Sequence, residues 1–491
     1  MNVNRLIALG LPAVLTASLA TAQAIPDHPE KLAFAPLTYT PPVARDQRVV
    51  LKNGMTAFLA EDRALPLVNI SVIIRAGAWL EPAGKEGLAR LTGQQMRAGG
   101  TKSLTAEQFD ERADFLAAQI GSSIGETSAT ASLNCLSDNL DDALKILIEM
   151  LREPRFQEDR LKLAKDQLLQ DMKKRNDESA DIESRELSVL LYGDDHVSNK
   201  FSTEASIKPL TREDLLAFHD LYYYPANMTL AVSGAFTKAE MIQKLDAAFA
   251  AWPSPKRVVS AIPAGIKTAA PGFYRMNKDV NQGRVSVVMP SALRTSPDIY
   301  ALEVMNEILG GSGFTSRITK TVRSNEGLAY SAGSGIGFGT YYPGRFRAAY
   351  QSKSSTVAYA LQLVFDEIQK MRETKVTDEE LVTIKNNIVQ TFPSSFESKA
   401  QQTSIFAGDE YSKRDPLYWS TYRDRIQAVT AAEVQRVAKE YLVPEKMIVL
   451  VVGNQAEIAR GDGKHEITID KLANGKVTDL ALRDPLTMKR K

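Results

Sequence analysis

A cation and an amide stand one helical turn apart in the stretch EGLARLTGQQMRAGG, residues 86–100. Leu88, Leu91 and Met96 recur at helical spacing, and a Gly-Gly pair ends the run, so the stretch predicts a helix. Arg90 and Gln94 are four residues apart and share one face of it. A guanidinium repels a metal ion and a neutral amide is a poor zinc ligand, so this pair does not build a metal site.

The histidines do not build a metal site either. The four of them, His28, His196, His219 and His465, are all more than five residues apart, and neither H-x-x-E-H nor H-E-x-x-H occurs. We interpret His196 and His219 as ordinary loop or core histidines. The chain alone is therefore expected to hold no zinc, and elemental analysis that finds one tightly bound zinc per chain would contradict this.

Length and composition limit the function further. A chain of 491 residues is long enough for two sizeable cores. Sixty Lys and Arg against 59 Asp and Glu give a net charge of +1, with no basic block, so nucleic acid is not an expected partner. Cys135 is the only cysteine, so no internal disulfide can form.

The first 24 residues, MNVNRLIALGLPAVLTASLATAQA, have the pattern of a secretory signal peptide. Arg5 precedes an apolar stretch, and Ala22 and Ala24 form an A-x-A cleavage site. The apolar stretch is shorter than the ~20 residues that span a bilayer. We therefore expect export to the periplasm, with no membrane attachment after cleavage.

The helices and strands that would position a functional site are predicted to occur as two copies of one unit. Residues 210–236 match residues 429–455 without a gap. The matched positions include Thr211 and Thr430, Pro225 and Pro444, and Gly234 and Gly453. Each copy begins with a capping box, runs through a helix, breaks at Pro and ends in an alternating strand. Two homologous α+β domains are predicted, each a mostly antiparallel sheet with helices packed on one face.

The proline-rich segment 252–272 has no sustained periodicity and is predicted to be the linker. The expected organisation is a signal peptide (1–24), an N-terminal extension (25–45), a first domain (46–251), the linker (252–272), a second domain (273–455) and a C-terminal tail (456–491).

Several ordered motifs together resemble the pitrilysin, insulinase and mitochondrial processing peptidase family. They are a strand followed by GLA at 87–89, the run YYYPANMTLAVSGAF at 222–236, and the duplication itself. The resemblance covers essentially the whole chain after the signal peptide, and it implies that the two domains form a clam-like half.

The resemblance also implies where a metal would have been. The family's H-x-x-E-H motif falls on Arg90, Gly93 and Gln94, and the family's third ligand, a Glu, falls on Asp171. Both histidines and the general base are missing, so these four positions are vacated slots. Because the slots converge on one metal in the family, and a lone carboxylate on an apolar face is costly, Arg90 and Asp171 are expected to pair.

The second half keeps a different family motif, GGSGFTSRITKTVRSNEGLAYSAGSG at 310–335. In the family, an Arg and a Tyr seven residues apart reach the active site from this half or from a partner subunit, which implies that role for Arg323 and Tyr330. A guanidinium and a phenol can hold the scissile carbonyl and stabilise its oxyanion. The glycine-rich loop, Gly310, Gly311 and Gly313, is expected to contact substrate.

Vacated metal slots beside a preserved Arg and Tyr resemble the non-catalytic subunit of the family's two-subunit bacterial peptidases. We therefore expect a complementing subunit of an exported zinc peptidase, with peptides or unfolded polypeptides as substrate. The partner chain would carry H-x-x-E-H and the zinc. The alternative is a scaffold or peptide-binding protein without any role in hydrolysis, which would have no need to keep Arg323 and Tyr330.

Overall fold

The computed structural model describes residues 27–28, 31–32, 38–255 and 257–490. The chain forms two units, residues 1–39 and 40–491. In the first unit an exposed ion pair of 2.7 Å joins Lys31 to Asp27. The expected signal peptide, residues 1–24, lies outside the described residues. Both sheets of the protein lie in the second unit.

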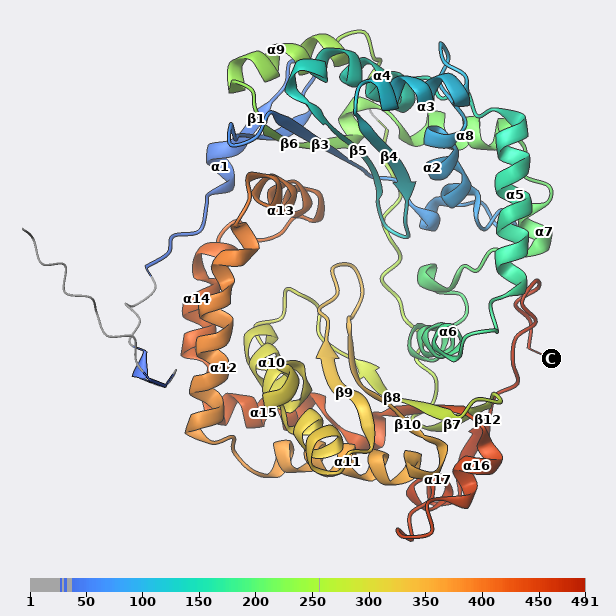
Figure 1. Cartoon of the computed structure of the whole chain (residues 1–491), viewed down its shortest axis with the longest axis vertical. Coiled ribbons are helices and arrows are strands. Elements are labelled where there is room, and N and C mark those ends of the chain that lie inside the picture. The colour runs from blue at the N-terminus through green and yellow to red at the C-terminus, as the bar shows by residue number, and fades with distance from the viewer. Residues whose placement is uncertain (1–26, 29–30, 33–37, 256, 491) are drawn as a thin grey trace, which may run out of the picture. The chain divides into compact units, whose positions relative to one another are not determined.

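The first half of the second unit builds a six-stranded mixed sheet in the order β1-β2-β6-β3-β5-β4 (Figure 1). Its strands are β1 (Arg48–Val50), β2 (Thr56–Glu61), β3 (Leu67–Ile74), β4 (Gln119–Ile124), β5 (Ala129–Leu136) and β6 (Met228–Gly234). Only β2 and β6 are parallel neighbours. Every second residue of β3 is buried, as its alternating sequence LVNISVII predicts.

Along the chain, the helices of this half precede the first strand, lie between later strands and follow the last one. They are α1 (Ala44–Gln47), α2 (Leu88–Ala98), α3 (Ala106–Phe115), α4 (Leu140–Arg152), α5 (Glu158–Lys173), α6 (Ser179–Tyr192), α7 (Glu204–Ile207), α8 (Arg212–Tyr222) and α9 (Lys238–Phe249). Helix α2 packs against β4 and α4 packs against β5. Their apolar faces form one buried core with the sheet.

The second half repeats this arrangement with a sheet in the order β12-β7-β11-β8-β10-β9 (Figure 1). The strands are β7 (Gly272–Asn277), β8 (Gln282–Pro290), β9 (Ala329–Ile336), β10 (Arg345–Lys353), β11 (Ile448–Gly453) and β12 (Val477–Asp479). The helices are α10 (Ile299–Asn306), α11 (Val357–Glu373), α12 (Asp378–Thr391), α13 (Lys399–Ser412), α14 (Tyr418–Ala428), α15 (Ala431–Tyr441), α16 (Gln455–Arg460) and α17 (Ile469–Leu472). β7 is parallel to β11 and to β12.

The predicted fold class is confirmed: two sheet-and-helix domains of related topology, each with a mostly antiparallel sheet. The repeat is visible at the N-terminal caps of two matching helices. Thr211 and Thr430 both form capping boxes, with Asp214 and Glu433, at the starts of α8 and α15. Each helix is followed by a short proline turn and then by β6 or β11.

The halves also exchange one helix each, which the sequence did not indicate. Helix α6, from the first half, packs on β8 and β11 of the second sheet, while α13, from the second half, packs on β2 and β6 of the first. The Phe406 ring of α13 lies 6.1 Å from the ring of Phe58. Helices therefore cover both faces of each sheet, where the sequence predicted helices on one face only, and this explains why β6 and β11 are buried almost throughout.

Helix α6 brings two buried carboxylates into the second half. Glu183 accepts a 2.5 Å hydrogen bond from the Ser286 hydroxyl and lies 3.1 Å from the Arg347 guanidinium. Glu186, which is fully buried, lies 2.6 Å from Arg490 and 3.2 Å from Arg483. Buried carboxylates require such partners, so these contacts hold α6 in place.

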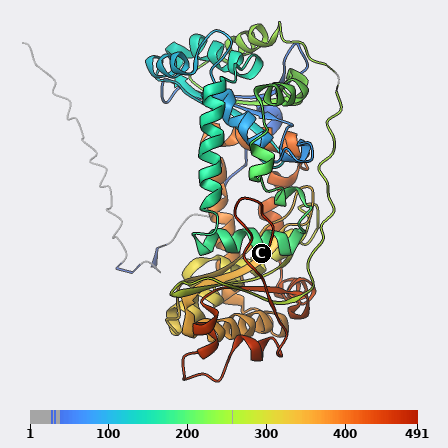
Figure 2. The same ribbon diagram turned by 90° about the vertical axis from the view of Figure 1, so that its right-hand side faces the viewer.

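The predicted linker, 252–272, ends where the first strand of the second sheet, β7, begins. Residues 257–271 form no helix or strand, and Figure 2 shows this segment running along one side of the unit. The expected tail, 456–491, needs correction, because it carries α16, α17 and β12, and β12 pairs with β7. The second domain thus extends beyond residue 455. Across the described part of the chain, no helix is both long enough and apolar enough to cross a membrane.

Candidate functional site

Helix α2 presents the vacated metal slots. Its apolar side buries Leu88, Leu91 and Met96 in the first core, so that Arg90 and Gln94 lie exposed on the opposite side. The cation and the amide thus share one face of α2, as their spacing predicts, and the structure shows that this face is accessible. Among the described residues, no three His, Cys, Asp or Glu side chains gather within reach of one metal ion.

Gly93, in the slot of the family's general base, faces the sheet. A Cβ atom added at Gly93 would lie 2.5 Å from the backbone nitrogen of Ile124 and 2.8 Å from its Cγ1. Both atoms belong to β4, so α2 lies directly against the strand backbone at this point. A Glu side chain has no space at position 93 unless α2 moves away from β4.

Gly93→Ala is therefore expected to destabilise the fold by about 1–3 kcal/mol, the usual cost of overpacking a core. The measurement is urea unfolding followed by circular dichroism. Gly408→Ala is the matched control, because Gly408 also lies within a helix, α13, but has open space where its Cβ would stand. It should be neutral or slightly stabilising. Equal losses in the two variants would show that the close approach to β4 carries no cost.

The expected pair between Arg90 and Asp171 is wrong. Both residues are exposed, and the ion pairs of the described residues include none between them. In α5 the buried stripe runs through Ala164 and Leu168 to Met172. Met172 takes the core position one turn after Leu168, so its neighbour Asp171 is turned into solvent, where a carboxylate needs no partner.

His196 and His219 both make contacts within the fold. His219 is buried, and its Nε2 lies 2.8 Å from the carbonyl oxygen of Leu151. His196 accepts a hydrogen bond from the backbone N–H of Ser198 and lies between the rings of Tyr192 and Tyr342. The interpretation of both as loop or core histidines is confirmed.

Glu81 fixes the start of α2. Its Oε1 accepts hydrogen bonds from the backbone N–H groups of Gly87, at 3.0 Å, and Ala89, at 2.8 Å. Gly87 precedes the helix with a φ of 102°, a conformation that favours glycine. Burial raises the pKa of the Glu81 carboxyl from 4.5 to about 7, although the two amides and Lys200 act in the opposite direction.

This raised pKa predicts a pH-dependent stability. The folded protein retains the proton on Glu81 where the unfolded chain has lost it, so the contribution is complete below about 4.5 and disappears as the pH rises to about 7. It amounts to at most about 3 kcal/mol. Urea unfolding at acidic and at alkaline pH should show this decline in the wild type and a smaller one in Glu81→Gln. Glu111→Gln, a change in an exposed carboxylate of α3 that does not act on Glu81, should leave it intact.

In the second half, two π-helical segments flank the glycine-rich loop, at Glu307–Gly311 and at Thr319–Asn325. Such segments are rare and are frequent at functional sites. A Cβ at Gly310 would lie 2.3 Å from the nitrogen of Ser334 in β9, and one at Gly311 would lie 2.5 Å from the Glu307 carboxylate. Gly313, with a φ of 61°, has open space. Packing against the β9 backbone thus accounts for Gly310, while Gly311 and Gly313 are both exposed.

Arg323 lies in the second π-helical segment, between two aromatic rings. Its guanidinium carbon is 4.9 Å from the centre of the Tyr330 ring and 4.4 Å from that of Phe314. Tyr330 is 86% exposed and Phe314 is 67% exposed. The ion pairs of the described residues include none to Arg323. The structure therefore brings the predicted pair together, with a cation that is stacked but not neutralised.

Phe314 is the member of this cluster that sequence reasoning missed. It belongs to the glycine-rich loop, nine residues before Arg323, where an aromatic residue has no spacing signal of its own. Gly327, with a φ of 63°, ends the helix and turns the chain so that Tyr330 returns beside Arg323. We name the three side chains Phe314, Arg323 and Tyr330 the aromatic clamp. Its exposed donors are suited to holding a peptide carbonyl.

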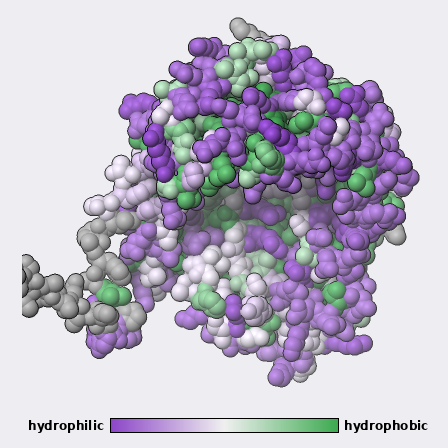
Figure 3. Space-filling view, turned by 45° about the horizontal axis from the view of Figure 1, so that its top comes forward, coloured by the Kyte–Doolittle hydropathy of each residue, from purple (hydrophilic) through white to green (hydrophobic). Residues whose placement is uncertain are grey.

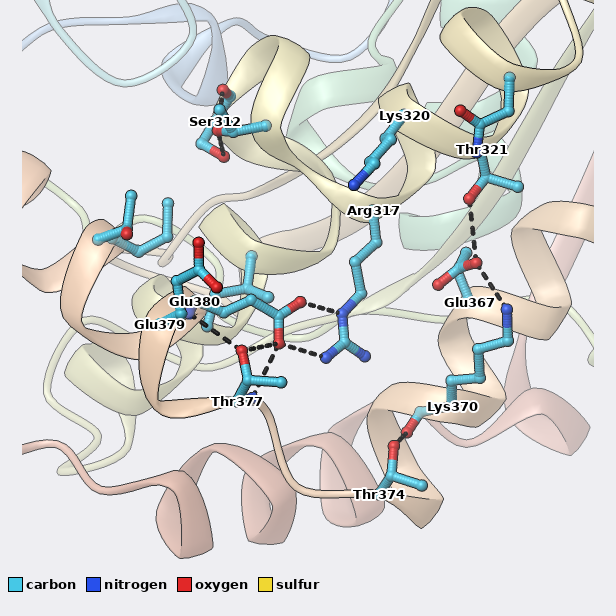
Figure 4. Close-up of a pocket in the computed structure, with 15 residues that line it drawn as sticks. Ser312, Arg317, Lys320, Thr321, Glu367, Lys370, Thr374, Thr377, Glu379 and Glu380 are labelled. Atoms are coloured by element: carbon cyan, nitrogen blue, oxygen red, sulfur yellow. Dashed lines mark hydrogen bonds and ion pairs between the residues drawn. The ribbon is translucent and has the colours of Figure 1, made fainter. Parts of the chain in front are cut away.

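The same loop forms one wall of a polar cleft of about 630 Å³ (Figure 4). Here Arg317 makes a bidentate ion pair with Glu380, with both N to O distances 2.7 Å. This contact raises the pKa of Arg317 and lowers that of Glu380. Because Glu380 also caps α12 through Thr377, the pair joins the loop to that helix and serves as a brace.

Fold and site together define a duplicated protein of two sheet-and-helix domains, with an exposed Tyr stacked against a half-buried Arg in the second half. The family model of the insulinase family, peptidase family M16, matches residues 57–204, and that of the peptidase M16 inactive domain matches residues 209–388. The chain belongs to this family, and its sequence lacks the H-x-x-E-H motif.

Two curated relatives show the kinds of protein that this chain resembles. The chain is 23% identical over 422 residues to a probable mitochondrial-processing peptidase subunit beta of Arabidopsis thaliana, covering 82% of this chain and 77% of that protein. It is also 23% identical over 406 residues to the non-peptidase homolog YmxG of Helicobacter pylori, covering 80% and 91%.

Two solved structures share the fold. A peptidase M16 inactive domain from Pseudomonas fluorescens aligns with a TM-score of 0.74 and 24% identity, covering 83% of this chain and 97% of that one. The periplasmic protease PqqL from Escherichia coli aligns with a TM-score of 0.71 and 14% identity. That alignment covers 91% of this chain and 49% of PqqL, so this chain spans about half of that protein.

Proposed function

We propose that this chain is the substrate-binding, complementing subunit of an exported zinc peptidase. In this proposal a partner chain that carries H-x-x-E-H supplies the zinc and the general base, while Arg323 and Tyr330 hold the peptide carbonyl during attack. The substrate is a peptide or an unfolded polypeptide. The chain acts in the periplasm after removal of residues 1–24.

The aromatic clamp is the observation that carries the proposal. A half-buried guanidinium with no carboxylate partner, stacked between two exposed rings, has no evident role in the stability of its own domain. The slots in α2 offer no metal ligands, and Gly93 lies too close to β4 for a base to be restored. The chain thus retains groups for holding a substrate and lacks the groups for hydrolysis.

The sheet surfaces also suit an extended peptide. A cavity of about 270 Å³ beside α13 is lined by polar residues of the first sheet, among them Asn69, Ser71 and Asn134. Another, of about 490 Å³, is lined by the glycines and serines of β9 and by Arg345 and Arg347. Figure 3 shows a hollow on one face of the molecule with a mostly hydrophilic rim. Small and polar linings can accept many peptide sequences.

The names of the relatives are compatible with this role. One relative is named as a peptidase subunit, one as a non-peptidase homolog, and one structural neighbour as a periplasmic protease. A subunit that has lost its own metal ligands needs a catalytic partner to take part in hydrolysis. A scaffold needs none, and this difference allows a direct test.

The test is to recover the tagged chain from the periplasm of its own source and to identify what is bound. A stoichiometric chain that carries H-x-x-E-H, together with peptide hydrolysis by the complex that neither chain shows alone, is expected. Recovery of such a chain whose hydrolysis is unaffected by this subunit would favour the scaffold alternative.

A further inference from the structure

The cavity of about 490 Å³ over strands β9 and β10 has a one-sided charge. Among the described residues that line it, only Arg345 and Arg347 are charged. Phe346 and Ala348 are buried on the other side of β10, so the two arginines share one face of the strand. Gly335 stands opposite Arg347, and a Cβ there would meet no atom within 4 Å. The cavity therefore has room for a side chain of another molecule near the two guanidinium groups.

Glu183 of α6 contacts Arg347, but it is shared with a second arginine. Its Oε1 lies 3.1 Å from Nη2 of Arg347, and its Oε2 lies 3.6 Å from Nη1 of Arg284. Arg347 Nε donates to the Ser286 hydroxyl, at 2.8 Å, and none of the hydrogen bonds within the described chain uses Nη1 of Arg347. One buried carboxylate thus fixes two guanidinium groups and compensates the charge of only one.

Arg345 has no counter-charge of its own. Its side chain is exposed, and the ion pairs and hydrogen bonds of the described residues include none to its guanidinium. Burial raises the pKa of Tyr342, and the nearby Glu126 carboxylate adds to this effect, but Glu126 neither lines the cavity nor pairs with Arg345. The guanidinium groups of Arg284, Arg345 and Arg347 therefore leave an excess of positive charge beside the single carboxylate of Glu183.

The cavity begins next to the aromatic clamp. The register of β9 and β10 shifts at Tyr330, which is the extra residue of a β-bulge. Ser331, the next residue, already lines the cavity, and Arg347 stands opposite Gly335, five residues after Tyr330. At ~3.4 Å per residue this is roughly 17 Å along the strand. One extended peptide beside β9 can therefore have a carbonyl at Tyr330 and a side chain near the arginines.

We infer that the cavity beside Arg345 and Arg347 binds an acidic side chain, Asp or Glu, of the bound peptide. This inference rests on the proposed function and deepens it, because it gives the substrate a preferred residue about five positions from the carbonyl at Tyr330. The guanidinium of Arg345 and Nη1 of Arg347 donate to the carboxylate oxygens. A basic side chain is repelled at the same place.

Fluorescence anisotropy with the purified full chain tests the inference. Four dye-labelled peptides of one uncharged sequence are compared: three amidated peptides with a central Glu, Gln or Lys, and the Gln peptide with a free C-terminal carboxylate. We expect the Glu peptide to bind about tenfold more tightly than the amidated Gln peptide, and the Lys peptide to bind most weakly. The preference should shrink at high salt. An equal gain from the free C-terminus would overturn the assignment to a side chain.

Arg345→Gln should abolish the preference for Glu without affecting folding, because Arg345 is exposed. Arg63→Gln, which removes an exposed arginine outside the cavity, should keep the preference. A preference that survives in Arg345→Gln would overturn the inference. Equal affinity of the wild type for the Glu and Gln peptides would also overturn it but leave the proposed function standing. Failure of every peptide to bind would overturn the inference and the peptide-binding part of the proposed function together.

Discussion

Peptide hydrolysis by the complex should fall by about 10²- to 10³-fold when Arg323 is replaced by Ala or Tyr330 by Phe. In the proposed function, each change removes a donor that would face the oxyanion of the attacked carbonyl, and such a donor acts mainly in the transition state. The loss should therefore appear in kcat more than in KM. The measurement is steady-state hydrolysis of a reporter peptide by the reconstituted pair.

Assembly must be measured beside activity. Tyr330 is 86% exposed and Arg323 has no ion pair, so both variants should form the complex normally in gel filtration. Arg460→Ala, which removes an exposed cation on α16, is the matched control and should keep full activity. Full activity of the Arg323→Ala and Tyr330→Phe complexes would contradict the proposed function and favour a scaffold. Normal assembly with a slow reaction supports it.

The second large effect is expected at the exchanged helix α6. Glu186→Gln should reduce the free energy of unfolding by about 3–5 kcal/mol, because it leaves the guanidinium groups of Arg185, Arg483 and Arg490 without their shared counter-charge. Arg483 and Arg490 lie near the C-terminus, so residues 480–490 should also become more sensitive to proteolysis. Urea unfolding and limited proteolysis measure the two consequences.

Asp194→Asn provides a control with the same partner. Asp194 also pairs with Arg483, at 2.7 Å, but its side chain is 65% exposed, so its loss should cost no more than about 1 kcal/mol. If the two variants lose equal stability, the burial of Glu186 has no special importance. If Glu186→Gln unfolds like the wild type, α6 is held by its apolar contacts and by those of Glu183, without a contribution from Glu186.

Much of the architecture follows from short-range features of the sequence. The capping boxes at Thr211 and Thr430 need only a side chain and an amide three residues apart, and both form as predicted. The alternation of β3 and the apolar face of α2 depend on the local period of strand and helix. The duplication adds only that the two halves should form related sheets, and the strand order itself comes from the structure.

Other features depend on residues far apart in the chain. No local pattern indicates that Glu183 and Glu186 of α6 would meet arginines of the second half, or that α13 would cover the first sheet. The face predicted for Asp171 was wrong, because helical spacing along α5 is compatible with either Asp171 or Met172 on the buried side. Packing against neighbouring helices selects Met172 for the core. Phe314 belongs to the aromatic clamp only because the π-helical segment Thr319–Asn325 and the turn at Gly327 bring the glycine-rich loop and β9 together.

The sequence by itself determined that the chain is duplicated, that the H-x-x-E-H motif is absent, and that Arg323 and Tyr330 are candidates for holding substrate. The first two conclusions rest on residue types and their spacing along the chain, and the third rests on the resemblance of residues 310–335 to a family motif. Only the tertiary structure decided that Gly93 lies against β4, that Arg90 and Asp171 are both exposed and do not pair, and that α6 is bound by charges of the other half. Close packing and charge compensation are set by distances in space, which spacing along the chain does not specify.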